Sequence, residues 1–285
     1  MTRELFRTSM HAMMELARTG DLISLFIMLT KDLNRKFINK IYKGETLLTT
    51  AVSFRHREII KLLCSVGADP NLMDKAFYTP LMIAAMLGDR YNCQLLLDKG
   101  ADPGLVNHMG LSALTYACQR SHSHIMSLLI RHGAPLEGSN SMLVHAIKNE
   151  RMEIILVLLY HGVDVNCPDE HGNLALQEAV QSDCIYIVDL LIRRGANVNA
   201  KDAKGRTALW YANRDTMIDI SELLLNNGAV LYDTALYTIE CQNDICSICL
   251  VDFELGETIK VLDCNHNFHP MCIDAWPKSC PMCRQ

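Results

Sequence analysis

Apolar residues recur at helical spacing along most of the chain. Residues 58–63 read Glu-Ile-Ile-Lys-Leu-Leu and residues 154–159 read Ile-Ile-Leu-Val-Leu-Leu, and both patterns are typical of helices that bury one face. A glycine follows such stretches after a few residues, and glycine readily takes the left-handed conformation that ends a helix. The pattern therefore predicts short helices closed by Gly67, Gly100, Gly133, Gly162, Gly195 and Gly228.

These glycines follow one another in steps of 33, 33, 29, 33 and 33 residues. A single helix pair hides only part of its apolar surface, so repeated pairs must stack on one another. The sequence therefore predicts a solenoid of helix pairs. A second landmark, a small residue, repeats in the same register at Ala51, Ala84, Ala117, Ala146, Ala179 and Ala212.

The repeat resembles the ankyrin repeat, whose period is about 33 residues. Residues 78–81 (Tyr-Thr-Pro-Leu) resemble the start of that family's inner helix, and residues 163–166 and 197–200 resemble the hairpins that link its repeats. The resemblance implies a mainly α fold, an ankyrin-repeat solenoid of stacked helix pairs with short hairpin loops. It implies an N-terminal capping helix pair over 1–40, six ankyrin repeats over 41–229, and a connector over 230–243.

The chain departs from the family pattern in two ways. The fourth repeat is four residues shorter than the others, so we expect its hairpin, Pro135 to Asn140, to be stunted. The family's inner-helix histidine is also missing, so we expect its Thr-to-His hydrogen bonds to be absent and packing to carry more of the stability. The residues in its place are Thr49, Met82, Thr115, Val144, Gln177 and Trp210.

The C-terminal segment carries eight cysteine and histidine residues in closely spaced pairs. Each Cys-x-x-Cys pair closes a tight turn that directs two sulfurs at one ion, and tetrahedral zinc takes four such donors. Eight donors therefore predict two closed zinc sites, which leave no open coordination position for water or substrate. The eight are Cys246, Cys249, Cys264, His266, His269, Cys272, Cys280 and Cys283.

This order of ligands resembles a RING finger of the two-histidine subtype over 244–285. The resemblance implies a cross-brace, with one Zn²⁺ held by Cys246, Cys249, His269 and Cys272 and a second by Cys264, His266, Cys280 and Cys283. So small a segment buries little core, so metal binding would supply much of its folding free energy.

RING-type ubiquitin ligases suggest roles for four further residues. By resemblance, Ile248, Trp276 and Pro281 form an apolar groove for a ubiquitin-conjugating enzyme, and Arg284 is the catalytic "linchpin" arginine. The implied activity is ubiquitin transfer from the conjugating enzyme's thioester to a substrate lysine, without a covalent intermediate on this chain. Cys241 lies outside the zinc set, and no recognisable catalytic domain surrounds it.

One departure keeps an alternative open. The stretch from Cys272 to Cys280 is shorter than in many relatives, and Pro277 directly follows Trp276, so a helix carrying Trp276 must end early. The interpretation as an enzyme therefore has an alternative, a non-catalytic adaptor. In that alternative the repeats bind a partner and the RING only scaffolds. A purely structural zinc fold is the plainest version of that alternative.

Composition and charge limit the kinds of partner that we expect for this chain. The chain has 285 residues, 49% of them hydrophobic, and a net charge of −5, which offers no basic footprint for nucleic acid. No apolar run approaches the roughly eighteen residues that span a bilayer, and the N-terminus lacks a signal-peptide pattern. We therefore expect an intracellular protein, cytoplasmic with the nucleus as the alternative, that does not bind membranes. Separately, we expect a monomer. The other cysteines lack motif spacing, and we expect small buried or half-buried residues without disulfides at Cys64, Cys93, Cys118, Cys167, Cys184 and Cys241.

Ankyrin proteins bind partners through hairpin tips and the inner-helix face. In this chain the later repeats offer mainly polar side chains at those positions, such as Glu170, His171, Asn173, Lys204, Arg206 and Arg214. The early repeats offer an apolar patch, which we interpret as a substrate anchor, against the alternative that its members pack between neighbouring repeats. The patch consists of Tyr42, Phe54, Phe77, Tyr78, Met86, Leu87, Met109 and Leu111.

Overall fold

The computed structural model describes residues 3–30, 36–136, 138–230, 235–238, 258–261 and 267–268. The chain divides into two compact units. The first contains residues 1–142 and 151–163, and the second contains residues 143–150 and 164–285.

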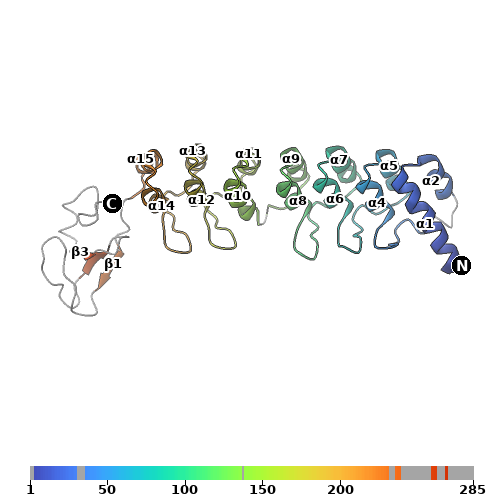
Figure 1. The fold of residues 1–285 in the computed structure, drawn as a ribbon, viewed down its shortest axis with the longest axis horizontal. Coiled ribbons are helices and arrows are strands. Elements are labelled where there is room, and N and C mark those ends of the chain that lie inside the picture. The colour runs from blue at the N-terminus through green and yellow to red at the C-terminus, as the bar shows by residue number, and fades with distance from the viewer. Residues whose placement is uncertain are drawn as a thin grey trace. The chain divides into compact units, whose positions relative to one another are not determined.

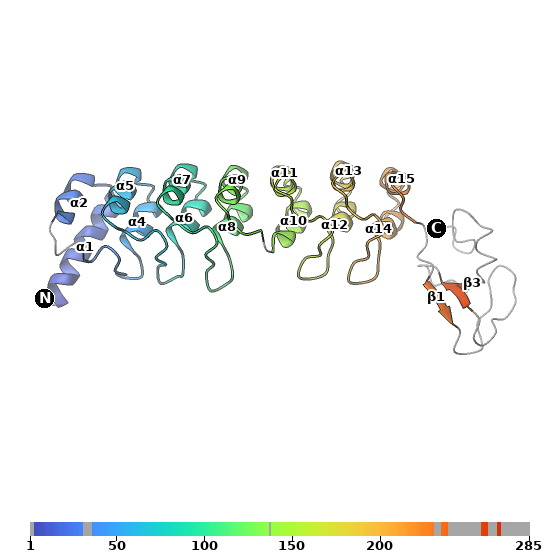
Figure 2. The ribbon, with the colours of Figure 1, turned by 180° about the vertical axis from the view of Figure 1, so that it is seen from behind.

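The first unit is a stack of helix pairs (Figures 1 and 2). The inner helices lie side by side, each pairs with the outer helix that follows it, and α1 packs on both α2 and α4. This arrangement confirms the predicted mainly helical solenoid. The helices are α1 (Arg3–Thr19), α2 (Leu22–Leu29), α4 (Leu47–Ser53), α5 (Arg57–Ser65), α6 (Pro80–Met86), α7 (Arg90–Asp98), α8 (Ala113–Gln119), α9 (Ser123–Arg131), α11 (Met152–Tyr160) and the first residues of α10 (Ser139–Lys148).

The second unit continues the pattern with two complete helix pairs. These are α12 (Ala175–Gln181) with α13 (Ile185–Arg193), and α14 (Ala208–Arg214) with α15 (Ile218–Asn226). Inner helix α12 packs on α14, and outer helix α13 packs on α15. The Gln177 side chain donates from Nε2 to the carbonyl oxygen of Ala200 at 2.6 Å and so ties the inner helix to the next hairpin.

The repeating alanines explain the close packing of the inner helices. All six, from Ala51 to Ala212, have 0% of their surface exposed. A methyl group at this position lets two helices approach closely, so a larger side chain would force them apart. The sequence landmark is therefore a packing position.

The inner helices α4, α6 and α8 begin at hydroxyl caps. Thr46, Thr79 and Ser112 each accept a hydrogen bond from a backbone N–H in the first helical turn. At all three starts the reciprocal bond is also made, because Thr49, Thr115 and Met82 accept from the cap residue's own N–H at 2.9, 3.4 and 3.5 Å. Thr49 and Thr115 stand where the family has histidine, and their capping boxes add local hydrogen bonds to the packing on which we expected the stability to depend.

Side-chain amides join consecutive repeats behind the hairpins. Asn71 donates from Nδ2 to the carbonyl oxygen of Gly100 at 3.1 Å and accepts from the Asp102 N–H at 2.7 Å. The same pair of hydrogen bonds occurs at three other asparagines. In the repeat that follows Asn71 the equivalent residue is Gly104, which has no side-chain amide. The other three are Asn39, Asn166 and Asn199.

The shortened fourth repeat has a reduced connection. Residues 132–138 separate α9 from α10, about half the length of the connection 99–112 between α7 and α8, which includes a hairpin bridge from Val106 to Ser112. Helix α10 has 10 residues where the other inner helices α4, α6 and α8 have 7. The fourth repeat is therefore shortened in its hairpin, as predicted. Its inner helix is longer than the others and includes part of the remaining connection.

The second unit also contains a three-stranded antiparallel sheet in the order β1-β2-β3. Strand β1 (Ala235–Thr238) pairs with β2 (Thr258–Val261), with Ala235 opposite Val261, and β2 pairs with β3 (Asn267–Phe268), with Lys260 opposite Phe268. The predicted connector 230–243 thus contains a strand that pairs with residues of the C-terminal segment. None of the helices in the described ranges is long and apolar enough to cross a membrane.

Candidate functional site

Four of the described hairpins are each shaped by one acidic or amide side chain. Asp74 accepts through Oδ1 from the N–H groups of Ala76 and Tyr78 at 2.8 and 2.9 Å. A carboxylate that accepts two backbone bonds fixes the loop locally, and the Lys75 N–H also donates to the carbonyl oxygen of Gly44 on the preceding hairpin at 2.9 Å. The position recurs once per repeat, and Asn107, Asp169 and Asp202 make the equivalent pair of bonds.

Phe77 is an exception among the hairpin tips. Its φ is +64°, in the left-handed region, whereas the equivalent residues of the other hairpins are glycines: Gly44, Gly110, Gly172 and Gly205. A side chain in this region costs about 1–2 kcal/mol relative to the right-handed conformation. The ring is 50% exposed and its centroid lies 5.2 Å from that of His108 on the next hairpin. A strained, exposed aromatic residue is a reasonable sign of function at this tip.

The predicted substrate patch divides into two groups. Phe54, Phe77 and Met109 are exposed, Met109 most of all at 66%. The other five are half-buried, so each still shows part of its surface while packing between repeats: Tyr42, Tyr78, Met86, Leu87 and Leu111. Packing between repeats therefore accounts for part of the set, and the substrate anchor stays a prediction for the exposed members.

Three lysines lie on or beside the first hairpins, near members of the patch in the sequence. Lys40, Lys43 and Lys75 are exposed and form no ion pair within the described ranges. The nearby carboxylates are already engaged, since Glu45 accepts from Arg18 at 2.9 Å and Asp74 holds its own hairpin. The hairpins of the first unit consequently carry exposed apolar side chains together with lysines that form no ion pair within the described ranges.

The hairpin surface of the second unit has different chemistry. Asp202 accepts from the Tyr211 hydroxyl at 2.6 Å and from Arg206 at 3.3 Å. Burial alone would raise the pKa of Asp202. The hydrogen bonds from Tyr211, Arg206 and backbone N–H groups outweigh burial, so the pKa of Asp202 is lowered. Burial and the Asp202 contact raise the pKa of Tyr211 to about 12. Arg206 and Arg214 lie 4.9 and 5.3 Å from the ring of Trp210, which gives this surface a cationic and aromatic character.

The two buried thiols, Cys93 and Cys118, are poor nucleophiles. Burial raises the pKa of Cys93 to about 12 and that of Cys118 to about 11. Cys64 and Cys184 are half-buried, as expected, but Cys167 is exposed, contrary to the expectation. Among the described residues no cluster of three or more His, Cys, Asp or Glu side chains could hold a metal ion.

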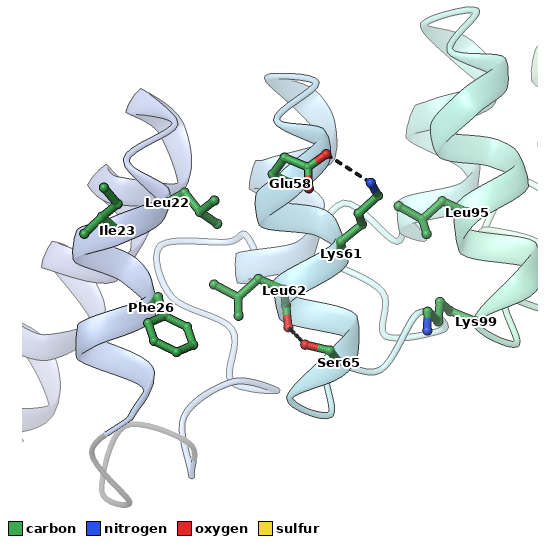
Figure 3. Close-up of a pocket in the computed structure, with 9 residues that line it drawn as sticks. All are labelled: Leu22, Ile23, Phe26, Glu58, Lys61, Leu62, Ser65, Leu95 and Lys99. Carbon is green, nitrogen blue, oxygen red and sulfur yellow. Dashed lines mark hydrogen bonds and ion pairs between the residues drawn. The ribbon is translucent and has the colours of Figure 1, made fainter.

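A groove that the sequence did not predict lies on the outer helices of the first unit (Figure 3). It has a volume of about 720 Å³ and lies between α2, α5 and α7. The run Leu22–Leu29, whose only polar residue is Ser24, could have indicated it, because a helix apolar on all sides exposes part of that surface when only one side is buried.

The zinc ligands predicted from the sequence, and Ile248, Trp276, Pro281 and Arg284, lie outside the described residues. The chemistry of the donor set fits zinc, because thiolates and imidazoles are the ligands that structural zinc sites use. Two of the eight, Cys264 and His266, belong to the short segment that connects the paired strands β2 and β3.

The stacked helix pairs, hairpins and amide bridges define an ankyrin-type solenoid, and comparison with protein families agrees. A model of ankyrin repeats in three copies matches residues 81–169 and 143–235, and a single ankyrin-repeat model matches residues 43–75. A model described as "Ring finger domain" matches residues 244–284. The chain belongs to the ankyrin-repeat family and carries a C-terminal RING finger, a class of domain that binds zinc.

Solved structures support the fold. The ankyrin repeat domain of Bcl-3, a member of the IkappaB protein family, has a TM-score of 0.67 at 26% identity, over 74% of this chain and 97% of that one. The human ASB11 ankyrin repeat domain has a TM-score of 0.60 at 23% identity, over 76% of this chain and 98% of that one, and shows similarity of fold alone.

Curated relatives match over a short stretch. The E3 ubiquitin-protein ligase ZNRF4 of Macaca fascicularis is 45% identical over 49 residues, which are 15% of this chain and 11% of that protein. NEP1-interacting protein 1 of Arabidopsis thaliana is 56% identical over 47 residues, 15% of this chain and 20% of that protein. The chain thus spans a fifth or less of the length of these relatives.

Proposed function

We propose that this protein is a RING-type ubiquitin-protein ligase. Its ankyrin repeats recruit a protein substrate, and its RING binds a ubiquitin-conjugating enzyme charged with ubiquitin. The observation that carries the proposal is the match of residues 244–284 to a RING finger, together with the short, highly similar stretch shared with proteins named E3 ubiquitin-protein ligases. The proposed organisation is a cap over 1–40, repeats over 41–229, a connector over 230–243 and the RING over 244–285.

The proposed zinc ligands form two interleaved sets. Cys246, Cys249, His269 and Cys272 hold one ion, and Cys264, His266, Cys280 and Cys283 hold the other. Zinc in such closed sites supplies folding free energy and no open position for catalysis. Its role here is to hold the docking surface in shape.

In the proposed reaction the amine of a substrate lysine attacks the thioester carbonyl on the conjugating enzyme. A C–N bond forms, the C–S bond breaks, and the thiol leaves on the conjugating enzyme. Ile248, Trp276 and Pro281 bind that enzyme, and Arg284 restrains the thioester by donating to carbonyl oxygens on either side of the contact. The raised pKa values of Cys93 and Cys118 agree with a mechanism that uses no thiolate of the repeats.

The proposed substrate anchor is the apolar hairpin surface of the first unit. Phe77 and Met109 at adjacent tips, with exposed Phe54, are its most accessible members. A test that replaces Tyr78 and Met86 would be ambiguous, because both are half-buried and their loss would disturb packing. Phe77→Asn with Met109→Ser is the sharper test, since asparagine tolerates the left-handed conformation at Phe77.

An autoubiquitination assay with a panel of conjugating enzymes tests the proposal. The wild-type chain should build ubiquitin conjugates, Trp276→Ala should lose them while retaining zinc, and Cys246→Ser should lose both. Silence of the wild-type chain across the panel would refute the ligase.

The alternative is a non-catalytic adaptor, favoured by the short Cys272-to-Cys280 stretch and by Pro277 beside Trp276. It predicts zinc binding and substrate capture without conjugates. Under either function we propose an intracellular monomer that binds neither nucleic acid nor membranes, which is consistent with the net charge of −5.

A further inference from the structure

The outward face of α2 is unusually apolar for the end of a repeat stack. Leu25 and Leu29 are buried against the stack, while Ile23 is 73% exposed, Phe26 53% and Ile27 55%. Terminal repeats of solenoids normally present a polar outer face, because no further repeat covers them. Helix α2 has no charged residue with which to do so.

This face continues into a groove. Leu22, Ile23 and Phe26 from α2 form one wall, Leu62 of α5 forms the floor, and Leu95 of α7 extends the apolar surface (Figure 3). The groove therefore crosses three successive outer helices. With packed helices about 8–10 Å apart, it is about 20 Å long, the length of a helix of about fourteen residues.

The charged groups of the groove are mostly positive. Lys61 is neutralised by Glu58, with Nζ to Oε1 at 3.0 Å. Lys99, at the α7 end, is exposed and has no ion pair within the described ranges. An occupant that covers the apolar wall thus meets an unneutralised ammonium group at one end.

We infer that this groove is a second docking site, which receives an amphipathic helix of a partner protein with acidic residues bordering its apolar face. Apolar side chains spaced at i, i+3, i+4 and i+7 match the row of aliphatic and aromatic groups from α2 to α7. A carboxylate at one end pairs with Lys99. The site lies on the outer helices, away from the hairpin tips (Figure 1), so the chain can hold this partner and a substrate at separate surfaces.

The test uses the full zinc-loaded chain and two synthetic fluorescent helical peptides of about fourteen residues. Both carry leucine at the four apolar positions, and they differ only in having glutamate or lysine along the border of the apolar face. Fluorescence anisotropy at low salt measures binding to wild type, Phe26→Ser and Lys99→Glu. Ile218→Ser on α15 and Lys204→Glu on a distant hairpin are matched controls, since each changes an exposed residue outside the groove.

Wild type should bind the acidic peptide about tenfold or more tightly than the basic one. Phe26→Ser should weaken binding of the acidic peptide about tenfold or more, because about half of a phenylalanine surface is no longer available for burial. Lys99→Glu should remove or reverse the preference between the peptides, and both controls should behave as wild type. Phe26→Ser should lower the unfolding temperature only slightly, because 53% of the Phe26 surface is exposed, and the helical circular dichroism signal of every variant should match that of wild type.

Equal affinity for the two peptides, or binding that Phe26→Ser leaves intact, would overturn the proposal. Self-association that Phe26→Ser abolishes would assign the face to a second copy of the chain, and binding to anionic vesicles with no peptide binding would assign it to a lipid surface. Each result contradicts the helix site. The assay does not involve the RING, so its outcome is independent of whether the chain is a ligase.

Discussion

Replacing Asn71 by alanine tests whether the amide bridges hold neighbouring repeats together. Asn71→Ala removes the 3.1 Å bond to the Gly100 carbonyl and the 2.7 Å bond from the Asp102 N–H. Each such bond contributes about 0.5–1.5 kcal/mol net, and the site is solvent-accessible, so the free energy of unfolding should fall by about 1–2 kcal/mol.

Urea unfolding of the full chain, followed by the helical circular dichroism signal, measures this cost. The lost bonds join two repeats, so the early part of the stack should open at lower urea and the transition should broaden. Asn213→Ala is the matched control, because Asn213 accepts a single exposed bond from Ser221 at 3.1 Å and bridges no hairpin.

A shift below about 0.5 kcal/mol for Asn71→Ala, or one no larger than that of Asn213→Ala, would refute the reasoning. Such a result would mean that water replaces the amide without loss. The hairpins would then be held by their own Asp and Asn turns and by packing alone.

Three further predictions follow from local geometry. Thr216→Gly should raise the free energy of unfolding by about 1 kcal/mol in urea, because a β-branched residue there has a φ of +58°; a decrease would contradict the strain argument. The lowered pKa of Asp202 contributes stability that is present above the unfolded-state pKa and is lost as pH falls through the folded-state value. Asp202→Asn should therefore flatten the loss of stability in acid, and an unchanged slope of unfolding free energy against pH would contradict this. In timed iodoacetamide labelling of native protein, read by peptide mass spectrometry, exposed Cys167 should react much faster than buried Cys93; equal rates would show that the repeat opens readily.

The sequence predicted the features that recur once in every repeat. Glycines and alanines one repeat apart located helix ends and packing positions because both depend on backbone geometry common to all repeats. Features formed between segments could not be predicted in this way. The Thr46–Thr49 capping box needed the observed side-chain rotamers, and the left-handed conformation of Phe77 became evident only when its φ was compared with those of the glycines in other hairpins.

The groove shows the same limit. Leu22–Leu29 is apolar on all sides, but the sequence does not say which side the stack buries. Only the positions of Leu62 and Leu95 on neighbouring repeats turn the remaining side into a groove. Likewise the pairing of β1 with β2 joins residues far apart in the chain, and no local pattern over 230–243 predicted that strand.

The most direct test of the ligase is discharge of ubiquitin from a charged conjugating enzyme onto free lysine, which needs no knowledge of the substrate. The full zinc-loaded chain should accelerate loss of the thioester by about tenfold or more, and Arg284→Ala should remove most of that acceleration while zinc content stays unchanged. No acceleration by the zinc-loaded wild-type chain with any conjugating enzyme of a broad panel would contradict the account and leave an ankyrin adaptor.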